Sequence, residues 1–290
     1  MTTAAEWLAG ARPRTLGAAI SPVLVGTAAA YADGDSVTWW RAGAALVVAL
    51  ALQIGVNYAN DYSDGVRGTD TRRAGPLRLT ASGVAAPAAV RNAAALAFGV
   101  AAVVGLVLAI AVDLRLLVVG ALAIAAAVLY TGGPRPYGYS GLGEVAVLVF
   151  FGVVATAGSA YVQLERVPAA AWWGAVALGL LACAILLANN IRDIDTDQAT
   201  GKRTLPVRIG APAARGLFVG CLAGAFLAVI AVGVLYPTTL IALAALPLAA
   251  QPVRLVMTRR DPPSLVAALV GTARLELVVA ALLSIGLVTA

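Results

Sequence analysis

Long apolar runs alternate with short polar segments along the whole chain. Each run is long enough to cross a bilayer as a helix, which needs about 20 mostly apolar residues. The pattern therefore predicts an all-α fold: a polytopic membrane helical bundle that forms a single domain over residues 1–290. The nine predicted spans are 16–32, 40–60, 88–112, 114–131, 143–163, 171–191, 212–233, 237–256 and 265–288.

The composition supports a membrane protein and narrows its chemistry. Hydrophobic residues make up 61% of the chain and charged residues only 12%, which is unlike a soluble domain. Histidine is absent, so histidine acid–base catalysis and histidine-bound metals are excluded. The net charge of +6 is better explained by cytoplasmic basic loops and anionic ligands than by nucleic acid.

The basic residues also predict an orientation. With the N-terminus in the cytoplasm, only Arg41, Arg115 and Arg166 fall on the outer side, while most other basic side chains fall on or near the inner side. The longest polar segments, about 61–87 and 190–211, then lie inside together with the 131–142 loop. We expect a multi-pass protein of the inner (plasma) membrane with a site facing the cytoplasm.

Two polar stripes sit at matching positions near the ends of the second and sixth spans. In each stripe an Asn precedes an Asp by four residues, so both side chains share one helix face. A carboxylate at membrane depth costs about 2.5–3.5 kcal/mol, so several of them indicate a function. Helix capping with solvated charges is the alternative. The two stripes read Asn57-Tyr-Ala-Asn-Asp-Tyr-Ser-Asp64, with Asp70 beyond, and Asn189-Asn-Ile-Arg-Asp-Ile-Asp-Thr-Asp197.

Facing stripes of this kind predict a Mg²⁺ site, because Mg²⁺ prefers oxygen ligands and keeps positions for phosphate oxygens. Magnesium at a membrane surface in turn suggests a diphosphate substrate, whose leaving group the ions would stabilise. The predicted metal ligands are Asn57, Asp61, Asp64, Asn189, Asp193 and Asp197, and the candidate catalytic carboxylates are Asp61, Asp193, Asp64 and Asp70.

Basic and aromatic residues follow both stripes and fill a third loop near residue 135. Arginine forks and the lysine ammonium suit phosphate oxygens, and tyrosine faces can stabilise a cation. The alternatives are the ordinary inner excess of positive charge and interfacial anchoring of tyrosines. The predicted substrate-binding residues are Arg67, Arg72, Arg73, Arg78, Arg135, Tyr130, Tyr137, Tyr139, Lys202 and Arg203.

With these motifs the chain resembles the UbiA superfamily of intramembrane aromatic prenyltransferases over nearly its whole length. The acidic stripes carry the resemblance, together with Ala11-Arg-Pro-Arg-Thr-Leu16, Gly75-Pro-Leu-Arg-Leu79 and Gly201-Lys-Arg-Thr-Leu205. The Asn-Asp-Tyr-x-Asp form of the first stripe and the Tyr130-Thr-Gly-Gly-Pro134 loop are most similar to the naphthoate branch of menaquinone biosynthesis.

The resemblance implies about nine helices around a central cavity that opens sideways into lipid, Mg²⁺ dependence and a polyprenyl diphosphate donor. It further implies 1,4-dihydroxy-2-naphthoate as acceptor, with loss of diphosphate and CO₂ to give a demethylmenaquinone. One departure stands out: Asn189 and Asn190 replace an Asp that some members carry early in the second stripe. A different acceptor, such as 4-hydroxybenzoate, homogentisate or phosphoribosyl diphosphate, and a cation-coupled transporter are the alternatives.

Overall fold

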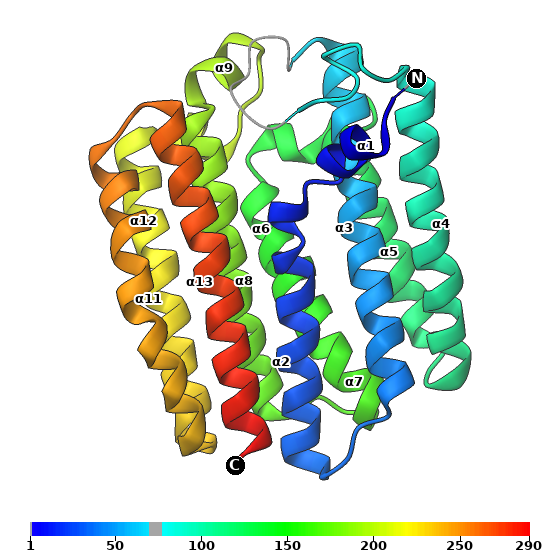
Figure 1. Cartoon of the computed structure of the whole chain (residues 1–290), viewed down its shortest axis with the longest axis vertical. Helices are drawn as coiled ribbons and strands as arrows, with labels where there is room; N and C mark the ends of the chain where they lie inside the picture. The colour runs from blue at the N-terminus through cyan, green and yellow to red at the C-terminus, as the bar shows by residue number, and fades with distance from the viewer. Residues whose placement is uncertain (1, 70–76) are drawn as a thin grey trace.

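The computed structural model describes residues 2–69 and 77–290, and the long helices of these residues lie side by side as one bundle (Figure 1). The helices are α1 (Ala4–Gly10), η1 (Pro13–Thr15), α2 (Gly17–Gly34), α3 (Trp39–Arg67), α4 (Pro87–Ala111), α5 (Arg115–Thr131), η2 (Tyr137–Ser140), α6 (Gly143–Val147), η3 (Leu148–Ala157), α7 (Gly158–Leu164), α8 (Ala169–Arg192), α9 (Ile194–Ala199), α10 (Leu205–Ile209), α11 (Ala211–Leu235), η4 (Pro237–Ala245), α12 (Leu246–Thr258) and α13 (Pro262–Val288).

The predicted helical membrane bundle is confirmed, and the predicted count of nine spans is approximate. Within the described residues, seven helical segments are long and apolar enough to cross a membrane. The N-terminal pair, residues 4–15 and 17–34, is bent by 51° and would add an eighth. Helix α5 coincides with the remaining predicted span but has only 17 residues.

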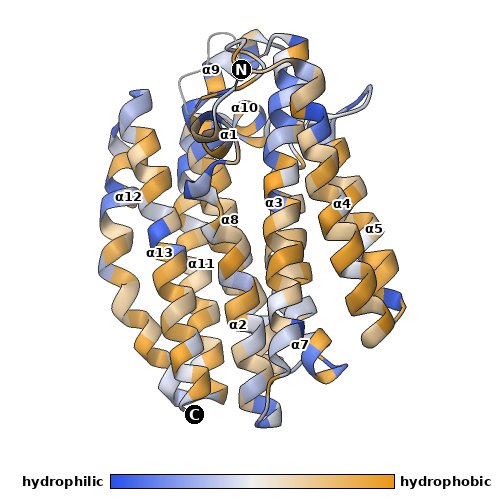
Figure 2. Ribbon diagram, turned by 45° about the vertical axis from the view of Figure 1, so that its right-hand side comes forward, coloured by the Kyte–Doolittle hydropathy of each residue, from blue (hydrophilic) through white to orange (hydrophobic). Residues whose placement is uncertain are grey.

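Polar and apolar residues are distributed as a membrane protein requires. Apolar residues cover the sides of the bundle, and hydrophilic residues gather near its two ends (Figure 2). The Trp39–Trp40 and Trp172–Trp173 pairs are exposed at the starts of α3 and α8, as expected for side chains at a membrane interface. The chain is therefore a multi-pass membrane protein.

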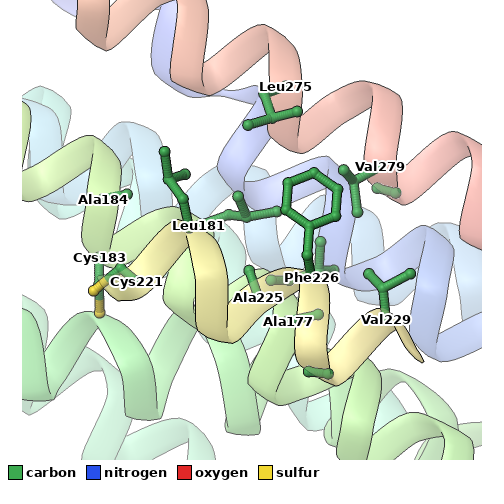
Figure 3. Close-up of a cluster of buried hydrophobic side chains, with 14 of the residues drawn as sticks. Ala177, Leu181, Cys183, Ala184, Cys221, Ala225, Phe226, Val229, Leu275 and Val279 are labelled. Atoms are coloured by element: carbon green, nitrogen blue, oxygen red, sulfur yellow. The ribbon is translucent and has the colours of Figure 1, made fainter. Parts of the chain in front are cut away.

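Helix α8 forms the centre of the bundle and packs closely against α11 and α13. In the 18-residue apolar stretch of α8, 67% of the residues are buried inside the protein. In the corresponding stretch of α4 only 28% are buried. Leu181 of α8, Phe226 of α11 and Leu275 of α13 belong to one apolar cluster, drawn in Figure 3. Because lipid is as apolar as these side chains, close packing supplies the association energy.

Small residues bring several helices into backbone contact. A Cβ on Gly152 of η3 would lie 2.7 Å from the Ala175 carbonyl oxygen and 2.8 Å from the Gly179 Cα, so the glycine sets the approach of η3 to α8. The run Leu148–Ala157 is π-helical, a geometry that is rare and frequent at functional sites. Phe150 and Phe151 of this run line the cavity described below.

Helix α3 continues past the end of its predicted span. It runs for 29 residues to Arg67, about 43 Å at 1.5 Å per residue, and Gly68 ends it in a left-handed conformation with φ 71°. The first polar stripe therefore lies entirely on regular helix. We call the end of the bundle that carries this stripe, α9 and the N-terminus the polar end; the C-terminus lies at the other end (Figure 1).

The contact between α2 and the fifth span gives a stability prediction. A Cβ on Gly26 of α2 would lie 2.2 Å from the Thr156 carbonyl oxygen and 2.8 Å from the Ser159 Cβ. Gly26→Ala should therefore lower the midpoint of thermal unfolding in detergent, by overpacking worth about 1–3 kcal/mol.

Gly99→Ala is the matched control, because a Cβ at this exposed position of α4 meets nothing within 4 Å. It should leave the midpoint unchanged or raise it, since alanine favours helix by about 0.5–1 kcal/mol. Equal midpoints for both variants would contradict the packing.

Candidate functional site

A cavity of about 410 Å³ opens between α2, α3, α4, α5, η3 and α8. Its lining is mostly apolar along the bundle and becomes polar toward the polar end, where α3, α8 and the segments after α5 and α9 contribute side chains. Nine of the predicted site residues line this cavity: Asn57, Asp64, Arg78, Tyr130, Tyr137, Tyr139, Asn189, Asp197 and Lys202.

One face of α3 carries the polar lining. Gln53, Asn57, Asn60 and Asp64 follow each other at spacings of four, three and four residues, and all four line the cavity. This spacing keeps the side chains within one arc of a helix with 3.6 residues per turn. Asp61 lies about 100° around the helix from Asn60 and is absent from the lining.

Asp61 instead holds the segment that follows the undescribed residues. It is 1% exposed, and its two carboxylate oxygens accept the backbone N–H groups of Leu79 and Thr80, both at 2.8 Å. These bonds fix the chain that carries Arg78 against α3. The two hydrogen bonds leave further lone pairs on the carboxylate that can bind a cation. The role of Asp61 as a metal ligand and catalytic carboxylate therefore stays a prediction.

Asp64 is the centre of a buried polar cluster. The Lys202 Nζ donates to its Oδ1 at 3.1 Å, and the Tyr139 hydroxyl donates to the same oxygen. The Lys202 and Asp64 side chains are only 7% and 5% exposed. The Lys202 ammonium also lies 4.7 Å from the Tyr139 ring centroid, a cation–π contact. Lys202 thus places a positive charge directly beside Asp64 in the cavity lining.

Asp197 meets the same cluster from the second stripe. Its backbone carbonyl accepts the Lys202 N–H at 2.8 Å, and its Oδ2 accepts the Thr204 hydroxyl at 3.4 Å. The 200–204 turn therefore wraps the Asp197 carboxylate while it carries Lys202 to Asp64. The bond between Lys202 and Asp64 in this way connects the first stripe with the turn that follows the second stripe, through residues 138 positions apart.

Asp193 is oriented differently because α8 ends at Arg192. Arg192 Nε and Nη2 donate to the two Asp193 oxygens, both at 2.7 Å, and Nη2 also donates to Asn189 Oδ1 at 2.9 Å. Asp193 is 3% exposed and does not line the cavity. Its predicted roles as metal ligand and catalytic carboxylate remain predictions.

The remaining predicted site residues fall into three groups. Arg67 donates to the backbone carbonyls of Thr131 and Gly133 and lies 5.6 Å over the Tyr139 ring, so it fixes the third loop. Arg135 and Arg203 are exposed and do not line the cavity. Asp70, Arg72 and Arg73 lie outside the described residues.

The tyrosines of the third loop face the cavity as neutral phenols. Burial raises the pKa of Tyr137 to about 12, and its hydroxyl donates to the Ala126 carbonyl at 2.9 Å. Burial, followed by the nearby Asp64 carboxylate, also raises the pKa of Tyr139. Tyr130 and Tyr137 pack edge to face at 5.5 Å. At neutral pH Tyr137 and Tyr139 are therefore hydrogen-bond donors rather than bases.

Several lining residues escaped the sequence prediction of the site: Arg12, Thr15, Gln53, Asn60, Asn190 and Thr204. Asn60 and Asn190 stand inside the stripes, and Gln53 is an isolated polar residue four positions before Asn57, so helical spacing was an available signal for all three. Arg12 has a left-handed backbone with φ 55°, which the sequence does not indicate.

The lining chemistry suits a divalent cation bound jointly with an anion. Asp64 and Asp197 bring carboxylates to the lining, and Asn60, Asn189 and Asn190 bring side-chain amides. The Asn60 and Asn189 oxygens each already accept one hydrogen bond, from the Thr131 hydroxyl and from Arg192, and keep a second lone pair. Among the described residues no three His, Cys, Asp or Glu side chains form a metal-binding group. Mg²⁺ is usually bound by one or two carboxylates plus substrate phosphates, so this donor set matches its preference.

The geometry of Asp61 predicts a stability effect. Asp61→Asn replaces one acceptor oxygen by an N–H₂ group that faces a buried backbone N–H of Leu79 or Thr80. We expect a loss of about 1–3 kcal/mol, seen as a lower midpoint of thermal unfolding. Asp195→Asn, at an exposed position of α9, is the control and should unfold at the wild-type temperature. An unchanged midpoint for Asp61→Asn would show that the two backbone bonds do not matter.

The UbiA prenyltransferase family matches residues 19–287. The 1,4-dihydroxy-2-naphthoate octaprenyltransferase of Mycobacterium tuberculosis is 51% identical over 257 residues, 88% of each chain. The protein of the same name from Escherichia coli is 38% identical over 273 residues, 88% of this chain and 86% of its own length.

The solved structures show the same fold at low sequence identity. A UbiA homologue from Aeropyrum pernix superposes with a TM-score of 0.67 at 18% identity, over 93% of this chain and 97% of its own. A homologue from Archaeoglobus fulgidus, bound to DMAPP and Mg²⁺, gives 0.66 at 15% identity, over 97% and 99%. By its sequence match and its fold, the chain belongs to the UbiA prenyltransferase family.

Proposed function

We propose that the chain transfers a polyprenyl group from polyprenyl diphosphate to 1,4-dihydroxy-2-naphthoate, with loss of diphosphate and CO₂, giving a demethylmenaquinone. The relatives at 51% and 38% identity carry the name of this reaction. The observation that carries the proposal is the cluster of Asp64, Asp197 and Lys202 at the polar end of a mostly apolar cavity. An amphiphilic donor needs such a site: charge at one end and room for hydrocarbon at the other.

Electrostatics argues for a divalent cation in this reaction. Asp64 and Asp197 would repel a bare diphosphate, and the cations in the lining, Lys202, Arg78 and Arg12, do not offset the two carboxylates and the diphosphate together. Asp64 and Asp197, together with the amide oxygens of nearby asparagines, would hold Mg²⁺, whose charge stabilises the leaving diphosphate when it is bound. The Archaeoglobus fulgidus homologue with DMAPP and Mg²⁺ supports this role for the metal.

Lys202 and Arg78 provide the protein's own cations for the donor. Both line the cavity near the carboxylates. Lys202 pairs with Asp64 in this structure, and the ammonium can exchange that partner for a diphosphate oxygen as a point charge. Arg78 is positioned by the Asp61 bonds to the two residues that follow it. Together they hold the diphosphate at the polar end.

The apolar part of the cavity would protect the reaction from water. Phe150, Phe151 and Val154 of η3 line it, with aliphatic side chains of α3 and α5 opposite. When the C–O bond breaks, an allylic cation forms in this environment, and the electron-rich ring attacks it in place of water. The Tyr139 ring, which already faces Lys202, can stabilise positive charge at the boundary.

We also propose that the polar end faces the cytoplasm and that the membrane is the plasma membrane. The basic residues of the 61–87, 131–142 and 190–211 segments support this orientation through the positive-inside rule. A cation-coupled transporter would place its carboxylates near the bilayer midplane, whereas Asp64 and Asp197 lie at one end of the helices.

A pair of substitutions tests the reaction and its metal dependence. Asp64→Asn and Asp197→Asn should each lower kcat/KM for pyrophosphate release by about 10²-fold or more, because each removes charge that holds the cation. The assay uses purified enzyme with Mg²⁺, 1,4-dihydroxy-2-naphthoate and a polyprenyl diphosphate, with the prenylated product identified by mass.

Asp195→Asn is the matched control, since Asp195 is exposed on α9 and outside the cavity lining; it should keep wild-type activity. Parallel assays with 4-hydroxybenzoate and homogentisate test the acceptor. Full activity of both cavity variants, or turnover by the wild type without any divalent cation, would refute the assigned site.

A further inference from the structure

Gln53 is a buried amide in the middle of α3 whose role the diphosphate site does not explain. It is 7% exposed and lines the cavity. It stands 11 residues before Asp64, about 16 Å along the helix and away from the polar end. A diphosphate held by Asp64 and Lys202 therefore does not reach it.

Hydrogen bonds fix which way this amide points. The Thr15 hydroxyl donates to the Arg12 carbonyl at 3.0 Å, so its oxygen is left to accept. It accepts from Gln53 Nε2 at 3.1 Å and from Asn57 Nδ2 at 3.3 Å. The nitrogen of Gln53 must therefore face Thr15, which turns its carbonyl oxygen Oε1 away from that residue.

The Gln53 oxygen is a buried acceptor that lacks a donor. Oε1 has no hydrogen-bond partner in the part of the chain that the structure describes. Buried polar atoms are nearly always paired, so an exception beside a binding cavity marks a place where a water or a ligand supplies the missing donor. A ligand that takes this place must therefore carry an O–H or N–H donor.

Only one of the two proposed substrates carries such a donor. A polyprenyl diphosphate has a hydrocarbon chain and, once ionised, only acceptor oxygens. A dihydroxylated aromatic ring has two phenolic O–H groups. The ring must also lie beyond the diphosphate, next to the carbon that it attacks, which is the direction in which Gln53 stands.

We propose, on the basis of the function above, that Gln53 Oε1 accepts a hydrogen bond from one ring hydroxyl of the aromatic acceptor and so determines acceptor specificity. Thr15 is the positioning residue, because it holds the amide in the accepting orientation. The bond orients the ring and selects a hydroquinone over an acceptor without a hydroxyl at that position.

The experiment compares the dihydroxynaphthoate with its two monomethyl ethers, which keep the electron-rich ring but lose one donor each. The two hydroxyls are chemically inequivalent, because one is adjacent to the carbon that bears the carboxylate, so the wild-type ratio of kcat/KM for the two ethers serves as the reference. The proposal predicts that this ratio changes about five- to tenfold when the acceptor atom of Gln53 is removed, the effect of one neutral hydrogen bond.

Gln53→Met removes the acceptor atom at similar length. It should raise KM for the dihydroxy acceptor about five- to tenfold and change the ratio of kcat/KM for the two ethers by a similar factor, while KM for polyprenyl diphosphate stays unchanged. A merely structural role would lower activity with both ethers equally and preserve their ratio, which would contradict the proposal.

Gln163→Met is the matched control, because the Gln163 amide pairs with the Thr38 backbone away from the cavity lining. It should leave every KM at the wild-type value. A wild type that does not prenylate the naphthoate at all refutes the proposed function. A wild type that does so, with an unchanged KM in Gln53→Met, refutes only the role of Gln53.

Discussion

The buried ion pair between Lys202 and Asp64 is the interaction on which the site depends. It joins α3 to the turn after α9, and through that turn it brings Asp197 to the same cavity. Burying two charges costs more than their attraction commonly returns, and a well-packed apolar pair would often be as stable. Under the proposed function the pair has another use: Asp64 would exchange Lys202 for a metal cation, and Lys202 would exchange Asp64 for a phosphate oxygen.

The rest of the bundle positions this pair. Helix α3 remains regular to Arg67, so one continuous face carries polar groups from Gln53 to Asp64. Helix α8 ends at Arg192, and the break at Asp193 lets α9 turn Asp197 toward the cavity. Asp61 and Arg67 anchor the neighbouring segments to α3 through backbone groups. Charge is thereby concentrated at one end, while the apolar length is left for hydrocarbon.

The helices could be predicted because a lipid environment permits few alternatives. A backbone in the bilayer must satisfy its own hydrogen bonds, so each long apolar run becomes a helix. The run at 143–163 is helical as predicted, but its π-helical segment carries no signal in the hydropathy pattern. Likewise the second stripe predicted one continuous arc, whereas the break at Asp193 separates Asn189 from Asp197.

The sequence predicted which types of residue form the site better than it predicted where their side chains point. The spacing of Asn57, Asp61 and Asp64 indicates a shared face, but packing decides where the centre of that face lies. In the structure the centre falls near Asn60, and Asp61 meets backbone groups 18 and 19 residues farther along the chain. No sequence pattern around Asp61 indicates that contact. The pairing of Asp193 with its neighbour Arg192 likewise depends on where α8 ends.

The most direct test of the central claim is a structure with Mn²⁺ in place of Mg²⁺ and a non-hydrolysable polyprenyl diphosphate analogue. Anomalous scattering would locate the metal without assumptions about the protein. The account predicts manganese within coordinating distance of both Asp64 and Asp197, with Lys202 moved from Asp64 to the diphosphate. Manganese bound away from these two carboxylates, or a diphosphate outside the polar end of the cavity, would contradict it.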